Sequence, residues 1–229
     1  MQSAALSSLV KRASDLTTEV AGLGSDRLLP VDERLRPLFP GAGLRRGSVI
    51  GVTGTVPGTT SLLMALLASA SASGSWCAVV GVPGLGFVAA AETGVVLERL
   101  ALVPNPGPDW PNVIAALVDG FDVVVIGAHR IGGRIAASVC AQMAARARRR
   151  GSVLVPFGPG WDGAEVTLSL VDSDWDGIGE GAGRRVTVSA RGRGAAALGK
   201  QLTMWLPEPA RPDVLETSGV SDTRLRLVR

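Results

Sequence analysis

The sequence predicts an α/β domain whose mostly parallel sheet is covered by helices on both faces and ends in antiparallel strands at its C-terminal edge. Three observations lead to this fold class. Short apolar runs alternate with helical patterns from Gly47 to about Phe157, as in chains of βα units. After Gly160 the pattern becomes an alternation of apolar and polar residues, which is typical of antiparallel strands. The chain has 229 residues, 46% of them hydrophobic, which is enough for one such domain with flanking segments.

Two segments precede the predicted core. Residues 1–24 are expected to form a helical arm, because apolar residues recur at spacings of three and four. This apolar stripe comprises Leu6, Leu9, Val10, Leu16 and Val20. Such a stripe can dock on its own domain or bind a neighbouring subunit, and the pattern leaves both readings open. Residues 25–46 are predicted to be a linker and a turn that leads into the core.

The core is expected over residues 47–207. Short apolar runs predict strands over residues 48–52, 76–82, 100–104, 122–126 and 152–157. Helical periodicity predicts helices over residues 60–71, 91–100, 108–117 and 135–150. The run at 122–126 is apolar almost throughout, so we expect that strand to be buried on both faces of the sheet.

The end of the chain has a different character. Residues 164–175 and 184–192 alternate apolar and polar side chains around a glycine-rich connection, which predicts an antiparallel pair. Residues 201–207 are expected to add a last strand. Residues 208–229 contain proline and charges with little periodicity, and we expect them to form a flexible tail.

The amino-acid composition argues against several classes of protein, including zinc-binding and membrane proteins. Cys77 and Cys140 lie in apolar surroundings and are expected to be buried free thiols in a reducing compartment. One histidine and no Cys-x-x-Cys pair argue against a zinc site. We find no signal peptide pattern and no block of about 18 strongly apolar residues, so we expect a cytoplasmic protein without membrane contact. The net charge of +3 permits contact with nucleic acid without requiring it.

The first predicted strand leads into a loop that resembles a phosphate-binding loop. With Gly58 as the second glycine of the pattern Gly-x-x-x-x-Gly-Lys-Ser/Thr, the first glycine position is Thr53, and Gly54 comes one place late. The lysine position is Thr59, and the hydroxyl that would hold Mg²⁺ belongs to Thr60. The loop at Gly54, Gly58, Thr59 and Thr60 is therefore degenerate, since it lacks the lysine that contacts the β- and γ-phosphates.

The strand expected to hold the metal-binding aspartate is degenerate as well. Val123 to Ile126 form the apolar run, but Gly127 stands where the Walker B aspartate is expected. No carboxylate follows the second strand to orient an attacking water. Because stabilisation of developing charge is usually the largest catalytic term, these losses predict a pseudo-ATPase with no catalytic residue, cofactor or metal.

These motifs carry a resemblance to a known family. The stretch LFPGAGLRRGSVIGVTGTVPGTTSLLMALLASA resembles the start of the RecA core, and FDVVVIG is similar to its Walker B strand. The resemblance implies a RecA-like three-layer fold. An arginine-rich chain of this kind that lacks both the P-loop lysine and the Walker B aspartate resembles the actinobacterial ImuA-prime proteins, which are RecA-related accessory factors of the mycobacterial mutasome.

That resemblance implies a scaffold function. The expected partners are ImuB, an inactive relative of Y-family polymerases, and an error-prone DnaE-type polymerase. Together they carry out translesion synthesis in the damage (SOS) response and cause mutagenesis, so the protein is expected at the nucleoid when recruited to damage. Self-association is compatible with this reading. The alternatives are a RecA-related regulator that binds DNA or binds nucleotide weakly, and a SulA-like inhibitor of cell division.

Two sets of residues are candidates for contacts. Trp161 and Trp175 lie in Gly/Asp-rich surroundings and are expected to be exposed anchors for a partner, as are the apolar residues of the N-terminal stripe. Candidate DNA contacts are Arg146, Arg149, Arg150, Arg184, Arg185, Arg191 and Arg193. Acidic residues between 172 and 180 crowd the same region as the later arginines and would repel a phosphate backbone.

Overall fold

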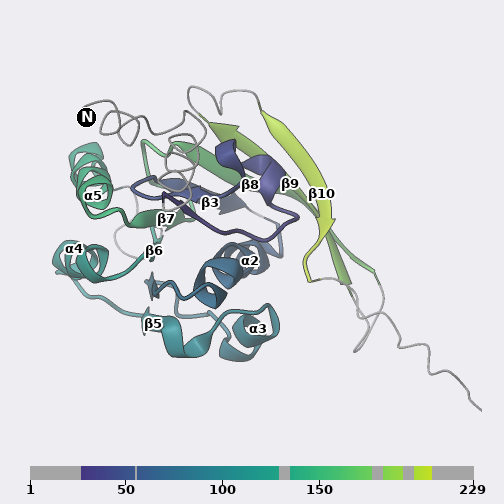
Figure 1. Cartoon of the computed structure of the whole chain (residues 1–229), viewed down its shortest axis with the longest axis horizontal. Coiled ribbons are helices and arrows are strands. Elements are labelled where there is room, and N and C mark those ends of the chain that lie inside the picture. Colours follow the sequence, from purple (N-terminus) through teal and green to yellow (C-terminus); the bar gives the residue numbers. More distant parts are fainter. Residues whose placement is uncertain (1–26, 55, 129–134, 177–182, 193–198, 208–229) are drawn as a thin grey trace, which may run out of the picture.

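The computed structural model describes residues 27–54, 56–128, 135–176, 183–192 and 199–207. Eight strands form one sheet in the order β10-β9-β8-β3-β7-β6-β4-β5 (Figure 1). Their bounds are β3 Ile50–Gly54, β4 Cys77–Val80, β5 Leu100–Val103, β6 Val123–Gly127, β7 Val153–Phe157, β8 Val166–Asp176, β9 Gly183–Gly192 and β10 Lys200–Trp205. Strands β8, β3, β7, β6, β4 and β5 pair in parallel, whereas β8, β9 and β10 pair antiparallel. The mixed α/β class and the mostly parallel sheet are confirmed.

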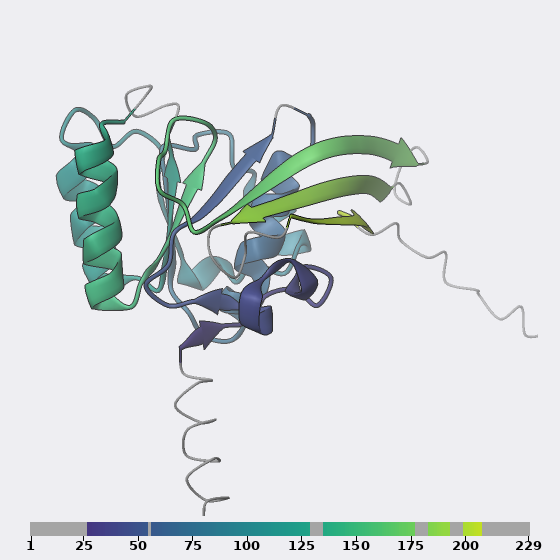
Figure 2. The same ribbon diagram turned by 90° about the horizontal axis from the view of Figure 1, so that it is seen from above.

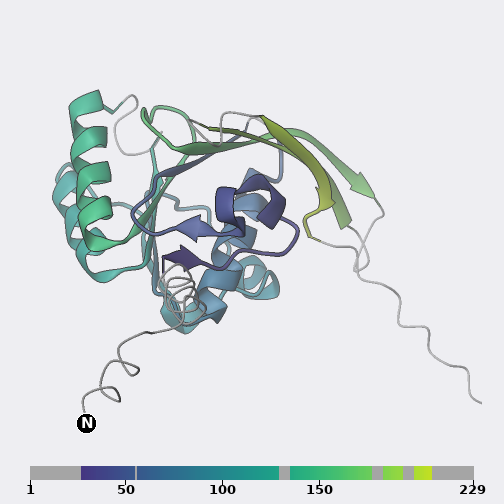
Figure 3. The ribbon, with the colours of Figure 1, turned by 45° about the horizontal axis from the view of Figure 1, so that its top comes forward.

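Helices cover both faces of the sheet. In the described ranges, the α-helices are α2 Thr59–Ala72, α3 Phe87–Glu92, α4 Trp110–Gly120 and α5 Ala137–Arg150. Alternate residues of one strand enter different core clusters: Val125 packs with the residues of α2, whereas Val124 and Ile126 pack with those of α4 and α5. All residues of β6 are buried, as predicted for a strand covered on both faces. Figure 1 and Figure 3 show α4 and α5 on one side of the sheet and α2 and α3 on the other.

The predicted helix over residues 91–100 is wrong. The helix in this region is α3, which ends at Glu92, and the chain turns at Gly94 with a φ of +94°. This left-handed conformation ends helices and favours glycine. The following residues form the short 3-10 turn η3 Leu97–Arg99, which leads directly into β5. The turn at Gly94 therefore breaks the predicted helix, and Val95 is the buried residue of this stretch, whereas Leu97 is 37% exposed.

Residues 28–45 belong to the folded domain and are more than a linker. β1 Leu28–Leu29 pairs antiparallel with β2 Leu44–Arg45, and the 3-10 turns η1 Arg36–Leu38 and η2 Pro40–Ala42 lie between them. Leu35 and Leu44 are fully buried in the same core cluster as α2. Figure 2 shows this segment beside the end of the sheet from which β3 starts.

The antiparallel end of the sheet extends away from the parallel part. β8 and β9 form a long pair with a register shift between Leu170 and Asp172, and Figure 2 shows them reaching beyond the rest of the domain. The outer strand β10 is held by the N-terminal segment. Arg34 Nη1 donates to the Trp205 carbonyl at 2.8 Å, and Lys200 Nζ donates to the Pro37 carbonyl at 2.7 Å. The predicted antiparallel pair and last strand are confirmed.

Candidate functional site

The degenerate loop lies where the sequence predicts it, between the end of β3 and the start of α2. Gly54 is the last residue of β3, and Gly58 precedes α2 with a φ of +104°. Only glycine adopts this conformation readily, so Gly58 is required for the turn itself. The α2 N-terminus consequently points toward the edge of the sheet at which the parallel strands end.

The side chains at the lysine position and at the first glycine position of the loop form hydrogen bonds within the protein. Thr59, at the lysine position, donates its hydroxyl hydrogen to the Val56 carbonyl at 3.0 Å. Its Oγ1 fills the space beside Gly54, where an added Cβ would lie only 2.5 Å from it. Thr53, at the first glycine position, shares a hydrogen bond of 2.9 Å with Ser169 of β8. These hydroxyls therefore stabilise the loop and its anchoring strand.

Gly127, at the Walker B aspartate position, has no room for a side chain. A Cβ on this residue would overlap the Gly81 carbonyl oxygen and stand 2.8 Å from the Gly81 carbonyl carbon. Gly81 follows β4, the strand that pairs with β6 on this side. The close approach of two backbones excludes aspartate at this position unless the end of β4 moves.

Arg184 of β9 reaches the loop from the antiparallel end of the sheet. A Cβ added to Gly58 would lie 2.9 Å from Arg184 Cδ, so the arginine side chain covers this glycine. The guanidinium lies over the Trp175 ring, 4.3 Å from its centroid, and Nη1 donates to Ser173 Oγ at 3.2 Å. Sequence reasoning found no arginine that approaches the loop. The available signal was the cross-strand pairing of Trp175 with Arg184, which the register of the predicted hairpin would supply.

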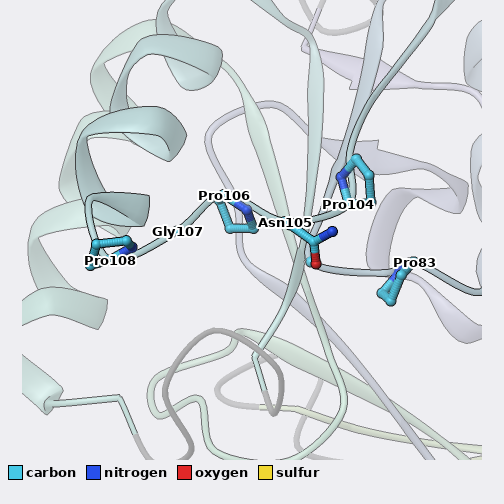
Figure 4. A pocket seen from close by; sticks show the side chains of 7 residues that line it. Pro83, Pro104, Asn105, Pro106, Gly107 and Pro108 are labelled. Atoms are coloured by element: carbon cyan, nitrogen blue, oxygen red, sulfur yellow. The ribbon is translucent and has the colours of Figure 1, made fainter.

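A cavity of about 350 Å³ opens at the ends of β4 and β5, beside Gly81. Pro83 comes from the loop after β4, and the other side comes from the loop after β5 (Figure 4). Its lining residues are Gly81, Pro83, Pro104, Asn105, Pro106, Gly107 and Pro108. Proline has no N–H to donate, and no charged side chain lines the cavity. Its lining therefore offers no positive charge to a phosphate, and its one side-chain donor is the Asn105 amide.

Several candidate DNA-contacting arginines are engaged in ion pairs. Arg146 and Arg150 of α5 both bind Asp119 of α4, at 2.5 Å and 3.0 Å. Hydrogen bonding from Arg146, with a further contribution from Arg150, lowers the pKa of the Asp119 carboxyl to about 2. Arg149 is exposed on the same helix end. The helix end is consequently less positive than its sequence suggests.

The later arginines occupy several environments. Arg185 is exposed and lies 4.0 Å from Asp174, and Arg191 is exposed on β9. The Arg184 side chain lies over the Trp175 ring and covers Gly58 of the loop. Arg193 and the five apolar residues of the N-terminal stripe lie outside the described residues. The structure thus does not gather the candidate arginines into one surface.

The two tryptophans predicted as anchors differ in exposure. Trp175 is 53% exposed on β8, as predicted. Trp161 is only partly exposed and packs against the core clusters of α4 and α5, and its indole N–H is buried. The expectation of an exposed Trp161 is therefore wrong, because the loop after β7 folds its ring against Ile135 and Cys140.

The remaining expectations concern thiols, metals and membranes. Both Cys77 and Cys140 are buried free thiols, as predicted. In the described ranges, no group of three or more His, Cys, Asp or Glu side chains lies close enough to hold a metal ion. None of the helices in the described part of the chain has the length and apolar content to cross a bilayer.

Comparison with known proteins places most of the parallel sheet in a described family. Residues 37–163 match the MT3502 N-terminal domain, a range that runs from η1 to the loop after β7 and includes the degenerate loop and Gly127. The chain is also similar to Rv3395c of Mycobacterium tuberculosis, an uncharacterized protein, with 37% identity over 155 residues. That match covers 62% of this chain and 74% of the mycobacterial protein.

Proposed function

Because the chain belongs to the MT3502 N-terminal domain family and has a degenerate nucleotide loop on a parallel sheet, we propose that it is a non-catalytic RecA-like accessory protein. It scaffolds a translesion-synthesis complex by contacting ImuB and, directly or through ImuB, an error-prone DnaE-type polymerase. The complex acts in damage-induced mutagenesis. The protein contributes a fixed binding surface and no chemical step.

One observation carries the non-catalytic part of this proposal, namely the backbone contact between Gly127 and Gly81. A RecA-type site needs an aspartate at the first of these positions to hold Mg²⁺ through water, and the contact leaves no space for its Cβ. The Thr59 hydroxyl, bonded to Val56, and the Arg184 side chain over Gly58 add to the argument. Three separate features thus oppose a working ATP site.

The assignment to a mutasome rests on the sequence resemblance. The turn into the core, the loop and the strand that ends at Gly127 together resemble ImuA-prime proteins. Similarity to a protein of Mycobacterium tuberculosis fits the actinobacterial distribution of those proteins. The parallel sheet with the loop between β3 and α2 supports the RecA-like core that the resemblance implies.

The surface we assign to the partner is the projecting pair of β8 and β9. It carries the exposed Trp175, whose ring is held in place by Arg184. Val171 on the same strand is 49% exposed. An exposed tryptophan whose ring is held by a neighbouring arginine is typical of the residues that dominate binding energy at interfaces.

Co-expression with ImuB, followed by size-exclusion chromatography with light scattering, tests the proposal. We expect a stable complex without added nucleotide that Trp175→Ala weakens strongly. Phe87→Ala is the matched control, since Phe87 is also an exposed aromatic residue, at 56%, but lies at the start of α3. If neither the natural chain nor the control variant forms a complex with ImuB, the proposed role in this assembly is wrong.

A further inference from the structure

A second exposed aromatic surface lies at the end of the sheet where the parallel strands begin. Trp76, just before β4, is 47% exposed although it is the largest apolar side chain in its neighbourhood. Its ring meets Phe121 edge-on at 6.3 Å, and the Arg99 guanidinium lies 5.5 Å from its centroid on another side. The ring is thus fixed in position, with much of its surface left in water.

An aliphatic side chain extends this surface. Leu97 of η3 is 37% exposed. The turn η3 lies beside Trp76, because Arg99 at its end donates to the Gly74 carbonyl at 2.8 Å and the next residue, Leu100, pairs with Cys77. We refer to the surface formed by Trp76, Leu97, Arg99 and Phe121 as the Trp76 face.

The described chain starts next to this face. The Arg46 N–H donates to the Arg27 carbonyl at 2.7 Å, and the Arg46 guanidinium donates to Asp122 Oδ1 at 2.7 Å. The other oxygen of Asp122 accepts the Trp76 N–H at 2.9 Å. Arg46 and Asp122 therefore link Arg27 to Trp76 through hydrogen bonds. Figure 2 shows β1 and β2 at this same end of the sheet.

The sequence that precedes Arg27 has a complementary pattern. Residues 5–21 place Leu6, Leu9, Val10, Leu16 and Val20 on one side of a predicted helix, with charged residues on the other. Such a helix would be about 25 Å long. The connection over residues 22–26 can span about 17 Å when extended, which is enough to turn the helix back onto the domain.

We propose that residues 5–21 dock as an amphipathic helix on the Trp76 face of their own domain. The apolar stripe covers Trp76 and Leu97, and the face in turn buries the stripe. An amphipathic helix gains most of its stability from such packing, and an exposed tryptophan beside the start of the segment supplies it. The inference does not depend on the proposed function, because it concerns the free protein.

Cysteine labelling of the full chain tests this docking. Leu97→Cys places a thiol on the Trp76 face, and its rate of reaction with a maleimide reports whether the face is covered. The native thiols do not interfere, because both are buried and burial, reinforced by Asp122, raises the pKa of Cys77 to about 12. We expect the paired change Leu9→Asp and Leu16→Asp to increase the labelling rate of Leu97→Cys by about tenfold, as release of a well-populated docked state would.

The matched control is Val171→Cys on β8, a position with 49% exposure that is remote from the Trp76 face. Its labelling rate should be the same with and without the two aspartates. Glu98→Cys, at an exposed position in η3, serves as a second reporter if Leu97→Cys impairs folding. Equal labelling of the η3 cysteine in both backgrounds would overturn the proposal. Protection that increases with protein concentration, together with a dimeric mass by light scattering, would also overturn it by showing that a second copy supplies the helix.

Discussion

Gly127 and Gly81 approach each other so closely that a Cβ on Gly127 would overlap the carbonyl oxygen of Gly81. Gly127 is the last residue of β6 and Gly81 directly follows the neighbouring parallel strand β4, at the edge where ligands bind in open α/β sheets. This contact leaves no space for a carboxylate side chain at the end of β6. It connects the sequence change at the Walker B position to a structural consequence.

Gly127→Ala should destabilise the protein by about 1–3 kcal/mol or more, because the added methyl group must displace the end of β4. Gly127→Asp should be worse, since it also buries a charge. Urea unfolding followed by circular dichroism measures the change. Gly120→Ala is the control: no atom lies within 4 Å of its added Cβ, and it should have little effect. A neutral Gly127→Ala variant would show that the β4 end is free to move.

Thr59→Lys restores the residue that a P-loop requires but should not create an ATPase. The site would still lack a carboxylate for Mg²⁺ at Gly127, and the Arg184 side chain would still cover Gly58. Phosphate release in the presence of Mg²⁺ and ATP should stay at the level of a blank. Thr59→Ser, which keeps the hydroxyl, is the matched control. Turnover acquired through the single lysine would contradict our account of the site.

The ion pairs of Asp119 should make the stability of the fold depend on pH in the acid range. The folded-state Asp119 pKa of about 2 lies below the ordinary value, so the ion pairs with Arg146 and Arg150 stabilise the fold at neutral pH. That contribution is present above about pH 4 and is lost as the pH falls toward 2. The natural protein should therefore be more stable than Asp119→Asn at pH 7, and the difference should disappear near pH 2. Thermal melts across this range, with Arg149→Gln as a control, measure it; a constant difference would contradict the linkage.

The same ion pairs lead to a prediction about DNA. Arg146→Gln should lower stability slightly and leave any affinity for single-stranded DNA unchanged, because the natural side chain is already paired with Asp119. Fluorescence anisotropy with a labelled oligonucleotide at low salt measures this affinity. A marked loss with Arg146→Gln, together with a steep dependence on salt, would favour the DNA-binding alternative.

The sequence predicted the parts of the fold that depend on local pattern. The apolar run at Val123–Ile126 is a strand buried on both faces, and the alternation after Gly160 is the antiparallel end of the sheet. The predicted helix over residues 91–100 is wrong because the chain turns at Gly94, with a φ of +94°, and the leucines after it belong to η3 and β5. The packing of Leu35 and Leu44 was missed because the apolar residues of this segment are interrupted by prolines and charges and follow neither a helical nor a strand period.

The sequence predicts which nucleotide-binding residues the candidate site lacks. It does not predict which groups occupy their places. The absence of lysine at Thr59 and of aspartate at Gly127 can be read directly from the sequence. The position of Arg184 over Gly58 depends on how far β9 extends past β3, which is a property of the tertiary fold. The burial of Trp161 likewise depends on the loop after β7 folding back over α5, and composition alone suggests exposure.

We propose that the loop after β3 retains its turn and has lost its nucleotide chemistry. Isothermal titration of the purified protein with ATP and Mg²⁺, combined with an assay of phosphate release, tests it most directly. We predict no heat of binding and no release above a blank. Binding with Mg²⁺-dependent turnover that Thr60→Ala abolishes would contradict the claim, because it would show that Thr60 still holds a metal ion at a working site.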